Sequence, residues 1–282
     1  MPDIAWINGV ITSLDDARVS FLDRGFLFGD GVYDVLKMCN GRTFAVKEHL
    51  DRLDRSMEAI RIRPSWSRLE LEEIIRDLAA KSELLDARIY IQVTRGAGPR
   101  KHEFSSGMTP TLAIFIVLQQ PFPEEIRKAG VRAITVADER WAHPHIKSLN
   151  LLPNVLARQQ AEESGAYEAI LIRDGELVTE CSSSNVFAVL NDTIVTPPTD
   201  GRILPGITRD LLLKAAREAN YPVKEDYLAL TELQSAAEIF VTNTGVEVLG
   251  VVELDGKPVG SGMPGRITGD LYRLFVSRWL NA

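Results

Sequence analysis

Short blocks of apolar residues, some alternating with polar ones, fill the first third of the chain and predict β-strands. Five segments fit a strand: residues 4–11, 32–38, 43–46, 87–94 and 111–118. Asn40-Gly41 separates two of them and is the residue pair that a tight hairpin turn prefers. A capping box at Ser67 and Glu70 begins one helix. An earlier helix is predicted by apolar residues at helical spacing, namely Leu50, Leu53, Met57 and Ile60.

The second half of the chain mixes strands with amphipathic helices. Asp174-Gly175 and Asp255-Gly256 have the composition of hairpin turns. The predicted strands are residues 131–137, 169–173, 177–180, 185–190, 239–242 and 246–252. The predicted helices are residues 153–164, 208–219 and 268–280. No internal repeat is visible, and the small number of crossover helices favours an α+β architecture with mixed sheets over a doubly wound one.

Two prolines, Pro121 and Pro123, mark a connector between the halves. A chain of 282 residues is long enough for two modest domains with separate cores. We therefore predict an N-terminal domain over residues 1–118, a connector over 119–130 and a C-terminal domain over 131–282.

Composition restricts the class of protein. The chain is 45% hydrophobic and 25% charged, as in ordinary globular proteins, and its net charge of −7 disfavours nucleic acid as a partner. No apolar run reaches the roughly 18 residues of a membrane span, and the first residues do not have the pattern of a signal peptide. The two cysteines, Cys39 and Cys181, are far apart and lack metal-binding spacing, as is typical of buried or half-buried thiols. These features predict a reduced cytoplasmic enzyme that acts on small molecules.

Lys147 lies in an unusual setting for a lysine. It is surrounded by apolar residues, just before the helix predicted to start at about residues 150–153. Partial removal from water favours the neutral amine, which is a nucleophile. Taken alone, the local sequence fits better a lysine that extends its ammonium group to the surface.

Other segments could bind anions. The helix that opens at Gly206, with Thr208 as a possible cap, could hold a phosphate at its N-terminus, although most such ends bind nothing. Residues 242–245 are compatible with a phosphate site or with a bare turn. Gly29-Asp30-Gly31 lacks the third glycine and the following helix of a dinucleotide-binding loop, which excludes that interpretation.

Two further sites carry charged groups. Arg100 and His102 are two residues apart, so in an extended segment both would point the same way and could bind a carboxylate. A solvated basic loop explains them as well. Glu180 lies between two predicted strands among small polar residues, where a glutamate usually marks a turn.

Taken together and in order, these residues resemble the class IV aminotransferases of the fold-type IV pyridoxal-phosphate (PLP) enzymes, most closely the bacterial D-amino-acid (D-alanine) aminotransferases. The similarity extends over nearly the whole chain. It is densest in residues 23–33, 48–53, 92–96, 146–152 and 182–187. The resemblance implies a two-domain α+β fold with a small N-terminal α/β domain, a larger C-terminal mixed-sheet domain, and PLP as cofactor.

The resemblance also implies roles for single residues. Lys147 matches the lysine that forms a Schiff base with the cofactor and then shuttles the substrate proton. Glu180 matches the carboxylate that keeps the pyridine nitrogen protonated. Arg52 matches the phosphate-binding arginine, and Arg140 the arginine near the ring hydroxyl. Further phosphate contacts are implied for Ile207, Thr208 and Thr244.

The substrate side of the site is implied in the same way. Tyr33, Arg100 and His102 match the trap that holds the α-carboxylate in the D-specific enzymes. Asn243 lies beside the position of the substrate side chain. The implied reaction moves the amino group of a D-amino acid to a 2-oxo acid by a ping-pong route. The family is dimeric, so Arg100 and His102 could serve the neighbouring subunit.

The chain departs from the D-aminotransferase pattern at three positions. Asn243 and Gly245 replace small hydroxyl residues, and Cys181 replaces a glycine. These departures affect the expected side-chain preference and leave the cofactor chemistry untouched. The alternatives are a branched-chain L-amino-acid or (R)-amine transaminase, or an aminodeoxychorismate lyase of the same fold. A non-enzymatic binding protein is disfavoured because Lys147 and Glu180 are both present.

Overall fold

The computed structural model describes the chain except for residues 1–2, 106 and 281–282, and it contains two compact units. Unit 1 extends to Gln120 and also includes Ile146–Asn150. Unit 2 comprises Pro121–His145 and the chain from Leu151 onward. The division at residue 120 falls within the predicted connector. The exact domain boundaries stay a prediction.

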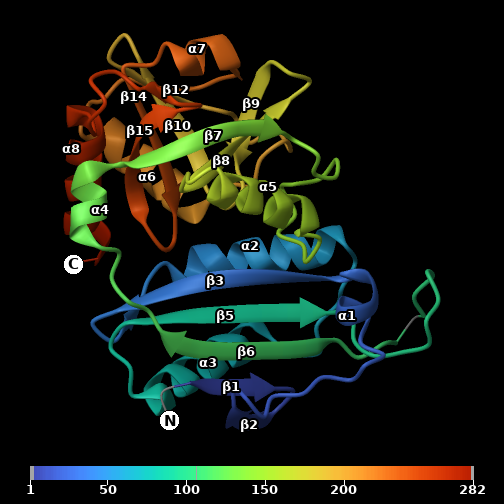
Figure 1. Cartoon of the computed structure of the whole chain (residues 1–282). Coiled ribbons are helices and arrows are strands. Elements are labelled where there is room, and N and C mark those ends of the chain that lie inside the picture. Colours follow the sequence, from blue (N-terminus) through green and yellow to red (C-terminus); the bar gives the residue numbers. More distant parts are fainter. Residues whose placement is uncertain (1–2, 106, 281–282) are drawn as a thin grey trace. The chain divides into compact units, whose positions relative to one another are not determined.

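Unit 1 is built on a six-stranded antiparallel sheet with the order β2-β1-β6-β5-β3-β4 (Figure 1). Its strands are β1 (Ile4–Ile7), β2 (Val10–Ser13), β3 (Gly31–Cys39), β4 (Arg42–Thr43), β5 (Ala87–Thr94) and β6 (Thr111–Leu118). Alternate residues of β3 and β5 are buried, as the apolar pattern requires of a sheet with one face on a core. The predictions for β3, β5 and β6 are confirmed.

The helices of unit 1 are α1 (Arg24–Phe28), α2 (Val46–Ala59) and α3 (Arg68–Ser82). Buried leucines of α2 and α3 pack with Val32, Leu36 and Ile89 in one core. Ser67 caps α3 through Glu70, and Glu70 accepts from the Ser67 amide, so the predicted capping box is confirmed.

The prediction of a single strand over residues 4–11 is wrong. Asn8 and Gly9 both have positive φ, and the chain reverses there, so that β1 and β2 form a hairpin. Apolar residues flank the turn on both sides, but Asn8-Gly9 is the same residue pair as in the turn at Asn40-Gly41, so the sequence contained a signal for it. The Asn40-Gly41 turn also has positive φ at both residues, as predicted.

Unit 2 contains a ten-stranded mixed sheet with the order β12-β11-β10-β14-β15-β7-β8-β9-β13, in which β16 pairs with β15 (Figure 1). Parallel pairs join β15 to β7, β7 to β8 and β11 to β12. The strands are β7 (Val131–Ala137), β8 (Glu168–Arg173), β9 (Leu177–Cys181), β10 (Asn185–Leu190), β11 (Thr193–Thr196), β12 (Val223–Glu225), β13 (Leu228–Ala229), β14 (Glu238–Asn243), β15 (Glu247–Leu254) and β16 (Lys257–Pro258). The mixed-sheet α+β class is confirmed.

The helices of unit 2 are α4 (Glu124–Ala129), α5 (Leu152–Glu163), α6 (Ile207–Glu218), α7 (Leu230–Gln234) and α8 (Arg266–Phe275), which continues into a π-helical turn (Val276–Leu280). The predicted connector is therefore not irregular throughout, because it contains α4. Among the described residues, no helix is both long and apolar enough to cross a membrane. Cys181 is buried and Cys39 is half-buried, as the sequence predicts, and both are thiols.

Ile146–Asn150 belongs to unit 1, although the sequence places it within the predicted C-terminal domain. The amide of Tyr33 donates to the Lys147 carbonyl at 3.0 Å, and the amide of Leu149 donates to the Gly31 carbonyl at 3.0 Å. The segment thus pairs antiparallel with the start of β3. A side chain on Gly31 would lie 2.7 Å from Leu149, so the glycine permits this close approach.

Candidate active site

The amine of Lys147 lies over the ring of Tyr33, 4.3 Å from its centroid. Both residues are half-buried. The segment is fixed through its backbone, because the Lys147 amide also donates to the hydroxyl of Ser56 on α2 at 3.2 Å. The structure therefore brings together two residues that the sequence singled out, 114 positions apart (147 − 33).

A buried ion pair lies one helical turn from Ser56. Arg52 donates to both oxygens of Asp34 at 2.9 and 2.8 Å, and both side chains are almost fully buried. Nδ1 of His49 lies 2.8 Å from the same carboxylate. Burial alone would raise the pKa of Asp34, but the charge of Arg52 and the bond to His49 hold it well below its usual range. Arg52 is thus held rigidly as a cation.

His49 is neutral in this arrangement. Burial lowers the pKa of His49 below its ordinary value, although Asp34 opposes the shift. In the neutral ring, Nδ1 carries the proton that Asp34 accepts, and Nε2 is left as an acceptor. Nε2 is buried and has no hydrogen-bond partner among the described residues.

Arg100 and His102 gather around one aromatic ring in unit 1. The guanidinium carbon of Arg100 lies 5.4 Å from the centroid of Phe28, and the His102 ring lies 5.6 Å from it. The segment is exposed and belongs to no strand. The guanidinium group and the imidazole ring share one neighbourhood, which is an arrangement that suits a carboxylate site.

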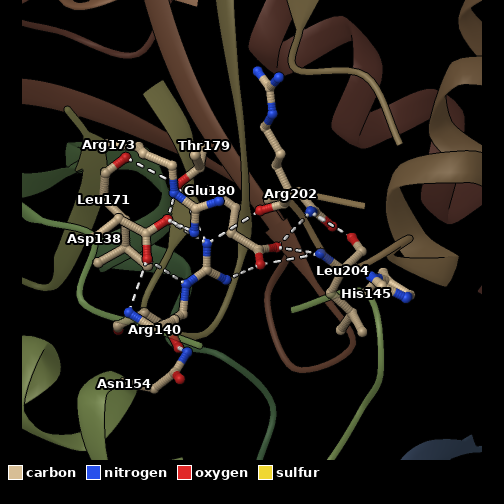
Figure 2. Close-up of polar contacts among 12 residues, drawn as sticks. Asp138, Arg140, His145, Asn154, Leu171, Arg173, Thr179, Glu180, Arg202 and Leu204 are labelled. Atoms are coloured by element: carbon tan, nitrogen blue, oxygen red, sulfur yellow. Dashed lines mark hydrogen bonds and ion pairs between the residues drawn. The ribbon is translucent and has the colours of Figure 1, made fainter. Parts of the chain in front are cut away.

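In unit 2, Arg140 links two carboxylates (Figure 2). Its Nε and Nη2 donate to Asp138 at 2.8 and 2.9 Å, and its Nη1 donates to Glu180. Burial alone would raise the pKa of Asp138, but Arg140, with help from Thr179 and Arg173, lowers it. Burial would lower the pKa of Arg140, but the two carboxylates raise it. Arg140 is therefore permanently charged.

Glu180 lies in β9 and is buried, which excludes the interpretation as a turn residue. Besides Arg140, its carboxylate accepts from the Asn185 amide group at 3.0 Å and from the Leu204 backbone amide at 3.0 and 3.1 Å. Donors of this kind stabilise the charged form of a carboxylate. Asn185 also approaches Gly206, where a Cβ would lie 2.0 Å from its oxygen, so only glycine fits at this N-cap.

The N-terminus of α6 is buried and carries no side-chain cap. Gly206 is its N-cap, and Thr208 is a buried residue of the first turn rather than the cap that the sequence allows. The N-terminus of α8 also follows a glycine, Gly265, but there Glu238 accepts from the amides of Ile267 and Thr268 at 3.0 and 2.8 Å. At α6 the N-cap residue is a glycine and makes no side-chain cap of its own. The amides of α6 suit an anion.

The turn after β14 uses the polar atoms of Asn243 internally. Its side-chain oxygen accepts from the amides of Gly245 and Val246 at 2.8 and 3.0 Å, and its nitrogen donates to Ser184 at 3.2 Å. Thr244 is half-buried beside it. The substrate contact predicted for Asn243 and the phosphate contact predicted for Thr244 remain predictions.

Comparison with known proteins identifies the family. The model of the amino-transferase class IV family matches residues 31–254. This chain belongs to the class IV aminotransferases. The aminotransferase is 43% identical to a D-alanine aminotransferase of Bacillus licheniformis over 261 residues, which covers 93% of this chain and 92% of that protein.

Solved structures show the same fold. A branched-chain amino acid aminotransferase of Escherichia coli superimposes with a TM-score of 0.93, at 26% identity, covering 100% of this chain and 96% of that one. A branched-chain aminotransferase of the thermophilic archaeon Thermoproteus uzoniensis, solved with norvaline, gives a TM-score of 0.88 at 25% identity, covering 96% and 93%. The predicted fold-type IV class is confirmed.

Several residues of these clusters were not predicted from the sequence of the aminotransferase. Asp34, His49, Asp138 and Asn185 each contact a predicted site residue through their side chains. One signal was available, since His49 and Arg52 are three apart on a helix and must share a face. The partners Asp34 and Asn185 lie on strands, and the sequence does not show which side chains they contact.

Replacing Asp34 by asparagine is expected to destabilise the aminotransferase by about 3–5 kcal/mol, because Arg52 would remain as a buried charge without its carboxylate. The depressed pKa of Asp34 gives a stabilising contribution that is complete above the unfolded-state value of about 3.9 and is lost as the pH falls further. The variant should therefore lose less stability in acid than the wild type does. Urea unfolding between neutral pH and pH 3 measures both effects.

Asp51→Asn is the matched control for this prediction. Asp51 lies on α2, the helix that carries Arg52, and pairs with Lys47 and Arg68, but its side chain is 34% exposed. The expected loss is below about 1 kcal/mol. If Asp34→Asn and Asp51→Asn lowered the free energy of unfolding equally, burial would not be what makes the Asp34 ion pair important.

Proposed function

We propose that this aminotransferase transfers the amino group of a D-amino acid such as D-alanine to a 2-oxo acid such as 2-oxoglutarate by a ping-pong route. The observation that carries the proposal is the placement of Lys147 against Tyr33 in a chain of this family. The D-alanine aminotransferase at 43% identity supports the substrate class.

PLP is the cofactor of class IV aminotransferases, and the residues of this chain fit it. The buried, uncapped amides at the start of α6 suit its phosphate, as does the fixed cation Arg52. The ionised Glu180 suits a protonated pyridine nitrogen. When bound, PLP reacts through its aldehyde with amino groups and withdraws electrons from the substrate Cα.

Lys147 would first bind the cofactor aldehyde covalently and then, once displaced by the substrate amine, act as the base that takes the proton from Cα. A base must reach the proton that it removes. The backbone bonds of Lys147 to Tyr33 and Ser56 fix the base of its side chain, so only the flexible stem has to move. The Tyr33 ring beneath the amine limits its other directions.

Glu180 would keep the pyridine nitrogen protonated by placing a negative charge beside it. Asn185 and the Leu204 amide orient its carboxylate, and Arg140 keeps it ionised. A role of Arg140 near the ring hydroxyl is part of the same proposal. Arg140 would make that contact with a guanidinium group whose Nε and Nη2 already donate to Asp138.

The position of the carboxylate trap would decide the handedness of the substrate. The Cα–H bond must point toward Lys147, so exchanging the carboxylate and side-chain positions inverts the handedness that is accepted. Arg100, His102 and the Tyr33 hydroxyl would form the trap. The planar guanidinium of Arg100 suits both carboxylate oxygens.

Arg100→Ala is expected to lower kcat/KM for D-alanine by about 2–4 kcal/mol of transition-state stabilisation, as for a lost charge-assisted contact. A primary (R)-amine has no carboxylate, so its kcat/KM should fall much less in this variant. Steady-state kinetics with D-alanine, L-leucine and an (R)-amine on wild type and variant measure this difference.

Lys101→Ala serves as the control for this comparison, because its side chain is equally exposed and carries the same charge. Lys101→Ala should leave kcat/KM unchanged for all three substrates. The structural similarity to branched-chain enzymes makes L-leucine the informative competitor. A wild-type preference for L-leucine, or an equal penalty on all three substrates in Arg100→Ala, would overturn the D-specific assignment.

We also propose that the enzyme is a cytoplasmic homodimer. Phe21 and Phe26 support a subunit interface, since their rings lie 5.3 Å apart and the two residues are 74% and 66% exposed. Two cysteines that remain thiols suit a reducing compartment. Light scattering of the purified protein measures the subunit number, and a monomeric mass at working concentration would exclude the dimer.

A further inference from the structure

Arg24 is an almost fully buried arginine, 4% exposed, at the start of α1. All three nitrogens of its guanidinium group have partners. Nε donates to Asp30 at 2.7 Å, Nη1 donates to the Lys101 carbonyl at 2.6 Å, and Nη2 donates to the His102 carbonyl at 3.0 Å. One side chain thus fixes two consecutive carbonyls of a segment 77 and 78 positions away.

Asp30 fixes Arg24 in turn and is itself held by a second arginine. Arg95 donates to both oxygens of Asp30 at 2.8 Å. Burial alone would raise the pKa of Asp30, but Arg95 and Arg24 lower it below its ordinary value. The guanidinium carbon of Arg95 also lies 3.7 Å from the ring centroid of Phe104. The segment from Lys101 to Phe104 is therefore anchored to a rigid charged cluster at both ends.

The anchored carbonyls determine where two exposed side chains point. Arg100 and His102 belong to no helix or strand, so the hydrogen bonds of a ladder do not orient them. Arg24 also lies 4.7 Å from the centroid of Phe28, the ring that Arg100 and His102 approach. With the carbonyls of residues 101 and 102 fixed, the backbone that carries both side chains can no longer rotate freely.

We propose that Arg24 is a positioning residue for the substrate carboxylate, acting through the backbone of Lys101 and His102 to hold Arg100 and His102 in register. This inference rests on the proposed function. Arg24 itself would not contact the substrate, since all three of its guanidinium nitrogens bind groups within the protein. Loss of Arg24 should therefore weaken carboxylate recognition and spare the chemical step.

The first test is the division of its effect between KM and kcat. Arg24→Gln should raise KM for D-alanine about tenfold or more and change kcat by less than about threefold, as for a loss of ground-state orientation. Arg24→Lys keeps the charge beside Asp30 but cannot reach both carbonyls. Arg24→Lys should fold normally and show the same raised KM with nearly unchanged kcat. The proposal can therefore be tested with this variant even if Arg24→Gln folds poorly. A fall in kcat with unchanged KM in Arg24→Lys would overturn it.

A double-mutant cycle tests whether Arg24 acts through Arg100. In an Arg100→Ala background, Arg24→Lys should raise KM by a smaller factor than it does in the wild type, because one of the two side chains that it positions is already gone, and in an Arg100→Ala/His102→Ala background it should raise KM by less than about threefold. Independent effects that multiply would show that Arg24 acts elsewhere and would contradict the proposal.

Hydrogen exchange of the holoenzyme supplies a readout independent of activity. Arg24→Lys should accelerate exchange of backbone amides over residues 99–104, with the rest of unit 1 unchanged. Arg68→Lys is the control, since Arg68 also binds a carbonyl, that of Lys47, together with carboxylates in unit 1, yet contacts no residue of the segment. It should change neither KM nor exchange in the segment.

The two proposals fail in different ways. Wild-type protein without D-alanine activity would remove the proposed substrate and leave the exchange result standing. Unchanged exchange over residues 99–104 in Arg24→Lys, with active wild type, would remove the positioning role alone.

Discussion

Lys147→Ala is expected to reduce transamination by about 10⁴-fold or more, because the variant loses both the covalent link to the cofactor and the base that moves the proton. The fold should survive, since the contacts of this segment with Tyr33, Ser56 and Gly31 are made by backbone atoms. PLP should still bind without a covalent bond, through Arg52 and the start of α6. Absorption spectra and half-reaction rates with D-alanine measure these outcomes.

Borohydride reduction followed by peptide mapping identifies the reactive lysine directly. The pyridoxyl mass should appear on the peptide that contains Lys147. Lys101→Ala is the control and should be labelled on Lys147 like the wild type, because Lys101 is exposed and lies elsewhere in unit 1. A label on any other lysine of the wild-type protein would end the assignment.

Glu180→Gln should slow proton transfer by about 10³-fold, or roughly 4 kcal/mol of activation free energy. The substitution keeps nearly the same shape but removes the charge that would hold the pyridine nitrogen protonated. Arg140 keeps its two bonds to Asp138, so the surrounding network should remain folded. Stopped-flow measurement of the half-reaction separates this step from substrate binding, which should persist.

Glu176→Gln provides the matched control. Glu176 is an exposed glutamate in the turn that precedes β9, so its replacement removes one charge nearby without touching the buried network. Its half-reaction should match that of the wild type. A Glu180→Gln enzyme with an unchanged rate would reduce Glu180 to a structural residue of the strand.

Elements with a strong local signal were predictable, and those that depend on distant partners were not. β5 has alternate buried residues and β6 is a nearly continuous apolar run, and they end at Thr94 and Leu118, as predicted. β1 and β2 were merged because apolar residues lie on both sides of Asn8-Gly9, although that pair is itself a turn signal. The short strand β12 has only three residues and depends on pairing with β11, which no local pattern reveals.

The same distinction applies to the site. Lys147, Glu180 and Arg52 were proposed because their blocks resemble a family, whereas their local settings were ambiguous. Asp34 and Arg24 were missed as functional candidates, because the value of a buried charge depends on its partner. Those partners are 18 residues away for Asp34 and as many as 78 for Arg24. Tertiary contacts, rather than composition, give these residues their importance.

The membership of Ile146–Asn150 in unit 1 has a consequence for biosynthesis. The ribosome releases the chain from the N-terminus, so the strands up to β6 can pair before Lys147 has been synthesised. The edge of β3 that receives the segment stays open during that interval. The Lys147 amine, the proposed reactive group, therefore reaches its place only after a further 25 residues (121–145) have been translated. A nascent chain that stops at Gln120 would carry a formed sheet but lack Lys147, so with the proposed role of this lysine the covalent capture of the cofactor becomes a late step in maturation.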